Sequence, residues 1–95
     1  MTISEIAEAL SRGIRAYELA RTKSLDFGIY VERLSLELSR HDRARGEQLK
    51  DLSMRLAALE VIGDNGQSQA ILPELRQLAD QIGTSAVEDR LTERM

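Results

Sequence analysis

The sequence has no cysteine and no tryptophan, only one proline and one histidine, and aromatic residues make up 3% of its 95 residues. Without cysteine, neither a disulfide framework nor a thiolate metal site can form, so redox chemistry does not indicate a compartment. No apolar run approaches the roughly 20 residues that span a bilayer, and the first residues lack the basic and apolar segments of a secretory signal. We therefore expect a cytoplasmic protein with no membrane partner.

Acidic residues outnumber basic residues: the chain has 13 Lys and Arg and 16 Asp and Glu, which gives a formal net charge of −3. This balance argues against general binding to nucleic acid, which depends on a surplus of positive charge near phosphate. The length suits one domain, 1–95, although a chain of this size buries only about 60–65% of the surface that its unfolded form exposes. The core is expected to be thin.

Apolar residues recur mainly at helical spacing, and β-branched residues seldom alternate with polar ones. Thr2 with Glu5, and Ser85 with Glu88, have the spacing of capping boxes that begin helices. Glycine at 63 and 83 suits helix ends, and Pro73 suits the first turn of a helix. The prediction is an all-α fold, a small bundle of four to five helices at about 3–22, 24–40, 47–62, 73–82 and 86–94.

Residues 40–48 contain no large apolar side chain, which leaves two interpretations open. A turn near Gly46 could separate two helices, or one long helix could run over 24–62. The continuous helix would be roughly 55 Å long at 1.5 Å per residue, longer than a compact domain of this size is wide. A break is the favoured interpretation.

The helix at 24–40 has apolar residues on two opposite sides. One side carries Phe27, Tyr30, Val31, Leu34 and Leu38, and the other carries Leu25, Ile29 and Leu36. Such a helix is expected to lie between two neighbours, either within its own chain or from another subunit.

The helix at 47–62 has a stripe of leucines at 49, 52, 56 and 59. Met54, Ala58, Val61 and Ile62 widen this stripe toward the far side of the helix. From this breadth we expect the helix to be deeply packed.

Groups for catalysis are scarce. His41 lies in the most polar stretch of the chain, without the apolar pocket or paired base that acid–base chemistry requires. Glu37 and His41 share a helical face, but a metal ion normally needs three or four ligands. No phosphate-binding or nucleophile motif occurs. We predict no enzyme, no catalytic residue, no metal or other cofactor, and no small-molecule substrate.

Residues 75–91 resemble a helix-turn-helix element. Leu78, Ala79, Ile82, Gly83 and Ser85 match its first-helix core, small contact residue, turn glycine and second cap. The second half departs from the family, with Asp89 and Thr92 where apolar residues are usual, and its acidic residues suit a phosphate-lined groove poorly. The resemblance implies one alternative function, a DNA-binding transcriptional regulator using residues 75–95.

The leading hypothesis is a non-enzymatic helical protein-interaction module, an adaptor, small chaperone or regulator that binds itself as a homodimer or a larger target protein. A further alternative is a helical subunit of a secretion or structural assembly. The basic cluster near position 41 could dock an acidic partner. The predicted interface consists of Leu19, Leu25, Ile29, Leu36, Arg40, Arg43 and Arg45.

Overall fold

The computed structural model describes residues 1–19, 23–63 and 66–93, of which the side chains at 24, 60, 68 and 86–93 are not described. These residues form four helices: α1 (Ile3–Glu18), α2 (Ser24–Ser39), α3 (Arg43–Ile62) and α4 (Gln67–Glu93). No strand occurs among the described residues. The predicted all-α bundle is confirmed.

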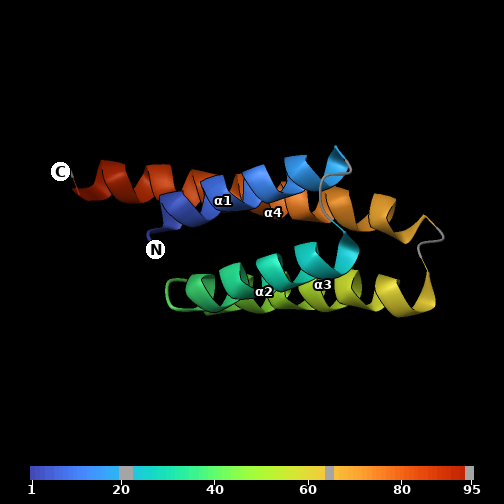
Figure 1. The fold of residues 1–95 in the computed structure, drawn as a ribbon. Helices are drawn as coiled ribbons and strands as arrows, with labels where there is room; N and C mark the ends of the chain where they lie inside the picture. The colour runs from blue at the N-terminus through green and yellow to red at the C-terminus, as the bar shows by residue number, and fades with distance from the viewer. Residues whose placement is uncertain (20–22, 64–65, 94–95) are drawn as a thin grey trace.

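Successive helices run in opposite directions and form two layers (Figure 1). One layer pairs α1 with α4, and the other pairs α2 with α3. Contacts between α1 and α2 and between α3 and α4 join the layers, so each helix touches two neighbours around a shared core. This is the up-and-down arrangement of antiparallel four-helix bundles.

The core lies between the two layers, and each helix contributes one stripe at helical spacing to it. On α2 the buried stripe is the predicted one, except that Tyr30 stays 39% exposed. The Tyr30 hydroxyl nevertheless donates a hydrogen bond of 2.8 Å to the carbonyl oxygen of Ala9 on α1. The buried apolar residues are Ile6, Ala9, Leu10, Ile14, Phe27, Val31, Leu34, Leu38, Leu49, Leu52, Leu56, Leu59, Ile71, Leu75, Leu78, Ala79 and Ile82.

The first helix begins with the predicted capping box. The Thr2 hydroxyl accepts from the Glu5 backbone N–H at 3.1 Å, and the Glu5 carboxylate accepts from the Thr2 backbone N–H at 3.2 Å. The backbone bond from Thr2, followed by the bond to its side chain, holds the pKa of Glu5 below its ordinary value. The helix ends at Glu18 with Leu19 as its C-cap, and the rest of the predicted range, 20–22, lies outside the described residues.

The expected break between 24–40 and 47–62 is present, so the alternative of one helix over 24–62 is wrong. The break falls at Arg40 to Asp42, and α3 begins four residues before its predicted start. Asp42 is the reason, because its side chain accepts from the Arg45 backbone N–H at 3.2 Å and caps the helix. Gly46 consequently lies inside α3 and not at the turn.

The last part of the chain departs from the prediction, because 73–82 and the described part of 86–94, residues 86–93, belong to one continuous helix. Ile71 is buried, and it extends the stripe of Leu75, Leu78 and Ile82 by one turn toward the N-terminus, so Pro73 lies inside α4. Pro73 costs this helix a backbone hydrogen bond, which the burial of Ile71 offsets.

The chain also stays helical from Gly83 to Ser85, where a turn was predicted. Only Gly63 and Gly66 have positive φ among the described glycines, so Gly83 is an ordinary helical residue and not a turn glycine. The Thr84 hydroxyl donates to the Asp80 carbonyl oxygen at 2.9 Å, a bond typical of a helix interior. The helix-turn-helix geometry predicted at 75–95 is therefore not formed over its described part, 75–93. The side chains of residues 86–93, and residues 94 and 95, lie outside the described part.

Candidate protein-interaction surface

The side of α2 that faces away from the core carries the second predicted stripe. Leu25 and Ile29 are each 42% exposed and Leu36 is 60% exposed, whereas Phe27 and Leu38 on the opposite side are 1% exposed. A helix in a bundle of four has one side toward the core and one side toward solvent, and α2 is apolar on both. Among the described residues, none covers the outward side.

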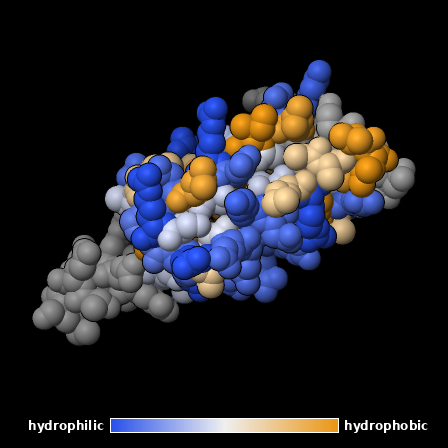
Figure 2. All heavy atoms as spheres, turned by 90° about the horizontal axis from the view of Figure 1, so that it is seen from below, coloured by the Kyte–Doolittle hydropathy of each residue, from blue (hydrophilic) through white to orange (hydrophobic). Residues whose placement is uncertain are grey.

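The third helix adds a second exposed stripe, which corrects the expectation that it is deeply packed. Met54 is 63% exposed, Val61 88% and Ile62 59%, and Ala58 is also exposed. We call the seven residues of the two stripes the outer hairpin face: Leu25, Ile29, Leu36, Met54, Ala58, Val61 and Ile62. Figure 2 shows hydrophobic residues gathered on this side of the molecule, mainly toward one end.

The two stripes adjoin because α2 and α3 pack unusually closely. A methyl group added at Gly28 would lie 3.1 Å from both the Ala57 backbone nitrogen and the Ser53 carbonyl oxygen. Small residues at such positions let two helix backbones approach, as they do where helices cross tightly. The buried hydroxyl of Ser53 is satisfied by the Lys50 carbonyl oxygen at 2.6 Å, so the contact carries no unpaired polar group.

Sequence reasoning found the α2 half of the outer hairpin face but missed the α3 half. The signal was present, since Met54, Ala58, Val61 and Ile62 follow the i, i+4, i+7, i+8 spacing of a single stripe. That spacing was interpreted as part of a broad buried face. It marks a separate side of α3, because the leucine stripe alone fills the core.

The predicted basic cluster is divided by the structure. Arg40 lies 3.8 Å from Glu37, and Arg43 lies 3.5 Å from Glu47. Both arginines are thus exposed beside an acidic residue of their own helix or turn, which reduces their net field. They do not form a continuous positive patch.

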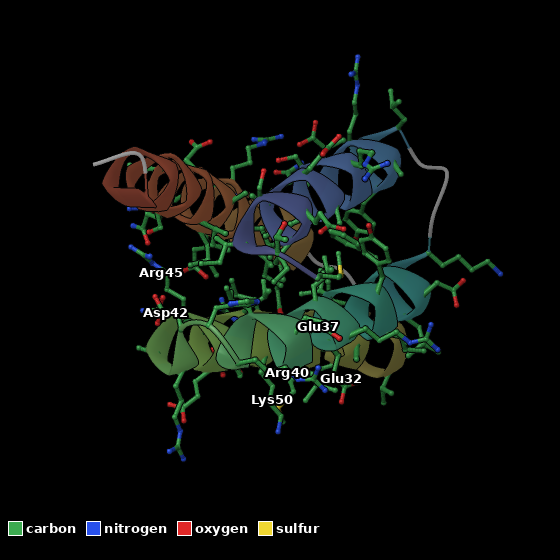
Figure 3. All side chains as sticks on the ribbon, turned by 90° about the vertical axis from the view of Figure 1, so that its left-hand side faces the viewer. Glu32, Glu37, Arg40, Asp42, Arg45 and Lys50 are labelled. Atoms are coloured by element: carbon green, nitrogen blue, oxygen red, sulfur yellow. The ribbon has the colours of Figure 1, made fainter. Side chains whose placement is uncertain are left out.

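Arg45 differs from these two because it points toward α4 (Figure 3). One of its guanidinium nitrogens lies 3.3 Å from the Asp42 carboxylate and donates to the Ser85 hydroxyl at 2.5 Å. Arg45 therefore links the start of α3 to α4, on the side of α3 that faces the other layer. It lies apart from Leu25, Ile29 and Leu36.

Leu19 is also separate from the outer hairpin face. It is 57% exposed and caps α1, which belongs to the layer formed with α4. Of the seven predicted interface residues, the structure brings Leu25, Ile29 and Leu36 together on one surface. Arg40 and Arg43 lie at the α2–α3 turn, at the end of that hairpin away from Leu25.

The groups considered for chemistry bind the N-terminal residue instead. The His41 Nε2 atom lies 2.8 Å from the Met1 carbonyl oxygen, and the Glu37 carboxylate lies 3.4 Å from the Met1 amine. No group of three or more metal-binding side chains comes together within the described residues. An open groove of about 370 Å³ between α3 and α4 is lined by Gln48, Asp51, Leu52, Arg55, Glu74, Gln77, Leu78 and Gln81. That lining contains no serine, threonine, cysteine, lysine or histidine.

Comparison with protein-family models, with curated proteins and with solved structures finds no match for this chain. Within the described helices, none combines the length and the apolar character needed to cross a membrane. The surface geometry is accordingly the basis for a functional proposal.

Proposed function

We propose that this protein is a non-enzymatic helical interaction module that binds another protein surface through the outer hairpin face. The observation that carries this proposal is the gathering of exposed apolar side chains on one side of one helix pair. Among the described residues nine large hydrophobic side chains are exposed, and six of them lie on this face. Single exposed apolar residues spread over a surface would need no explanation, but six on one side of one helix pair do.

The size of the face supports the same proposal. Its large side chains are between 42% and 88% exposed, which leaves several hundred Å² of apolar surface in water. The largest apolar patch on an ordinary monomer covers about 300–600 Å² and is often functional. Each Å² removed from water contributes about 25 cal/mol, so covering the face is favourable enough to drive association.

The face is also preorganised for binding. Its residues project from two helices whose backbones are held together through Gly28 and Gly46, so their spacing is set before a partner arrives. A rigid apolar surface loses little conformational entropy on binding, which leaves more of the burial energy for affinity. Helical faces of this kind are recognised by other helices.

A photo-crosslinking experiment in the native cell tests this proposal. A photoreactive residue in place of Met54 should give protein crosslinks, and the same residue in place of Gln77 provides the control. Gln77 is also exposed but faces the polar groove between α3 and α4. Adding Ile29→Asp to the Met54 probe should abolish its crosslinks, because a carboxylate at the centre of the face is costly to bury.

Equal crosslinking from both positions, or none from position 54, would show that the outer hairpin face is not a binding surface. The mass of any crosslinked product also distinguishes a second copy of this chain from a different protein. Circular dichroism of each variant checks that the bundle is still folded.

A further inference from the structure

We infer that the occupant of the outer hairpin face is a second copy of this chain, packed about a two-fold axis that runs parallel to α2 and α3. This inference rests on the proposed function and adds the partner and its orientation. It follows from the register of the hairpin and from where its charges lie.

The close contacts between α2 and α3 establish their register. Gly28 lies beside Ser53 and Ala57, and Gly46 lies beside Ser39. The helices are antiparallel and both rise 1.5 Å per residue. A residue a given number of positions after Gly28 on α2 therefore lies at the same height as the residue that number of positions before the Ser53–Ala57 contact on α3. Counting from Gly28, Leu25 is level with Ala58, Ile29 with Met54, and Glu32 lies within one turn of Lys50.

The outward side of the hairpin therefore has two different ends. Toward the start of α2 it is apolar, and toward the α2–α3 turn Leu36 lies among charged residues. Figure 3 shows Glu32, Arg40 and Lys50 on the side of the hairpin that faces away from α1 and α4. Among the ion pairs of the described residues, none includes Glu32 or Lys50. Both charges are available to a partner.

Two simple two-fold axes could pack one hairpin face on another, one across the helices and one parallel to them. Only the parallel axis places apolar end on apolar end. An axis across the helices would lay the apolar end of one copy on the charged end of the other and bury unpaired charges, which is unfavourable. An axis parallel to the helices keeps every residue at its own level, so apolar end meets apolar end. It also places α2 of each copy against α3 of the other copy, so Glu32 of each copy lies opposite Lys50 of the other.

The available area fits a stable pair. The hairpin face is about 30 Å long, from the 20 residues of α3, and two helices wide, which offers roughly the 800 Å² per partner of a standard interface. A two-fold pairing buries the same apolar residues twice and repeats the Glu32 to Lys50 contact twice. The face is thus complementary to itself in polarity and charge.

Sedimentation equilibrium of the purified chain tests the inference. The wild type should dimerise, and Ile29→Asp should weaken the dimer by more than a hundredfold. Glu32→Lys and Lys50→Glu should each weaken it by about tenfold, because each sets two like-charged pairs across the interface. Glu8→Lys makes the same charge change as Glu32→Lys on the exposed side of α1 and should leave the dimer unchanged.

The decisive measurement mixes the Glu32→Lys and Lys50→Glu proteins in equal amounts. In the mixed dimer both contacts join opposite charges again, so affinity should return to near the wild-type value. Repulsion within one chain would not be relieved by mixing, which separates the interface from a folding effect.

A monomeric wild type at high concentration would overturn the self-pairing. So would a dimer that survives Ile29→Asp, or one for which the two charge variants fail to complement each other. If the wild type is monomeric while the Met54 probe still crosslinks a different protein, the proposed function stands and only the self-pairing fails.

Discussion

The substitution Gly46→Ala is the most direct test of the close packing that brings the two halves of the outer hairpin face together. Gly46 lies inside α3, and a methyl group there would lie 2.7 Å from the Ser39 Cα atom and 2.8 Å from the Ser39 backbone nitrogen. Ordinary contacts between such atoms are about 3.5–4.0 Å, so the helices must separate by nearly 1 Å at this end. Backbone atoms cannot rotate away as a side chain can.

The magnitude follows from two opposing effects. Replacing glycine by alanine in a helix favours folding by up to about 1 kcal/mol. Overpacking in a well-packed contact typically costs about 1–3 kcal/mol, and the two backbone contacts place Gly46→Ala near the upper end. The net expectation is a loss of about 2 kcal/mol in the free energy of unfolding, equivalent to a fall in Tm of about 10 °C for a domain of this size.

Urea denaturation followed by circular dichroism measures the effect, with Gly83→Ala as the matched control. Gly83 lies inside α4, and apart from its chain neighbours and its own helix backbone a methyl group there would meet no described atom within 4 Å. Gly83→Ala should therefore stabilise the protein by about 0.5–1 kcal/mol through helix propensity alone. The same substitution is thus expected to change stability in opposite directions in the two helices.

Combining Gly46→Ala with Ser39→Ala tests whether the backbone atoms of Ser39, and not its hydroxyl, cause the loss of stability. Ser39→Ala removes the Ser39 hydroxyl from the neighbourhood of Gly46 but leaves the Cα atom and the backbone nitrogen in place. The double variant should therefore recover little of the lost stability. A Gly46→Ala protein at least as stable as the wild type would refute the close approach of α2 and α3 on which the outer hairpin face depends.

Three further predictions concern the core and the helix ends. Tyr30→Phe should lower the free energy of unfolding by about 1 kcal/mol, because the 2.8 Å bond to the Ala9 carbonyl oxygen is lost, and an unchanged urea midpoint would contradict it. Glu5→Gln should destabilise the protein at neutral pH, since the pKa of Glu5 is lowered in the fold by its bonds to Thr2. The stability difference is complete above the pKa of an unfolded glutamate and disappears as the pH falls through the lowered folded pKa, so a pH-independent difference would argue against the capping carboxylate. Ile71→Ala should cost about 2–5 kcal/mol and reduce helicity before position 73, which amide hydrogen exchange can follow, and protection equal to the wild type there would show that Ile71 does not anchor this turn.

Local information in the chain was sufficient for much of the fold. Helical periodicity, the capping box at Thr2 and the positive-φ glycine at 63 depend on neighbouring residues, so they could be predicted without knowing the tertiary structure. The division of α2 into a buried side and the exposed side of Leu25 and Ile29 was predictable for the same reason. Side chains spaced along one helix share a face whatever surrounds it.

The boundaries of α3 and α4 show where local signals conflicted. Gly83, with Ser85 after it, has the composition of a turn, yet the helix continues through both residues, and the Thr84 hydroxyl bonds to the Asp80 carbonyl oxygen within it. Sequence alone predicts Pro73 in the first turn of a helix, because its missing N–H costs least there. Burial of the preceding turn outweighed that preference, and burial depends on contacts with the other helices.

The sequence by itself determined that the chain is helical and which apolar residues share each side of each helix. Tertiary structure decided which of those sides are covered. It left Met54 and Val61 in solvent beside Leu25 and Ile29, and it turned Arg45 toward Ser85. The physical reason is that each helix in this bundle touches only two neighbours, so a second apolar side is buried only if another helix reaches it, and none of the four described helices reaches the outward side of α2 and α3.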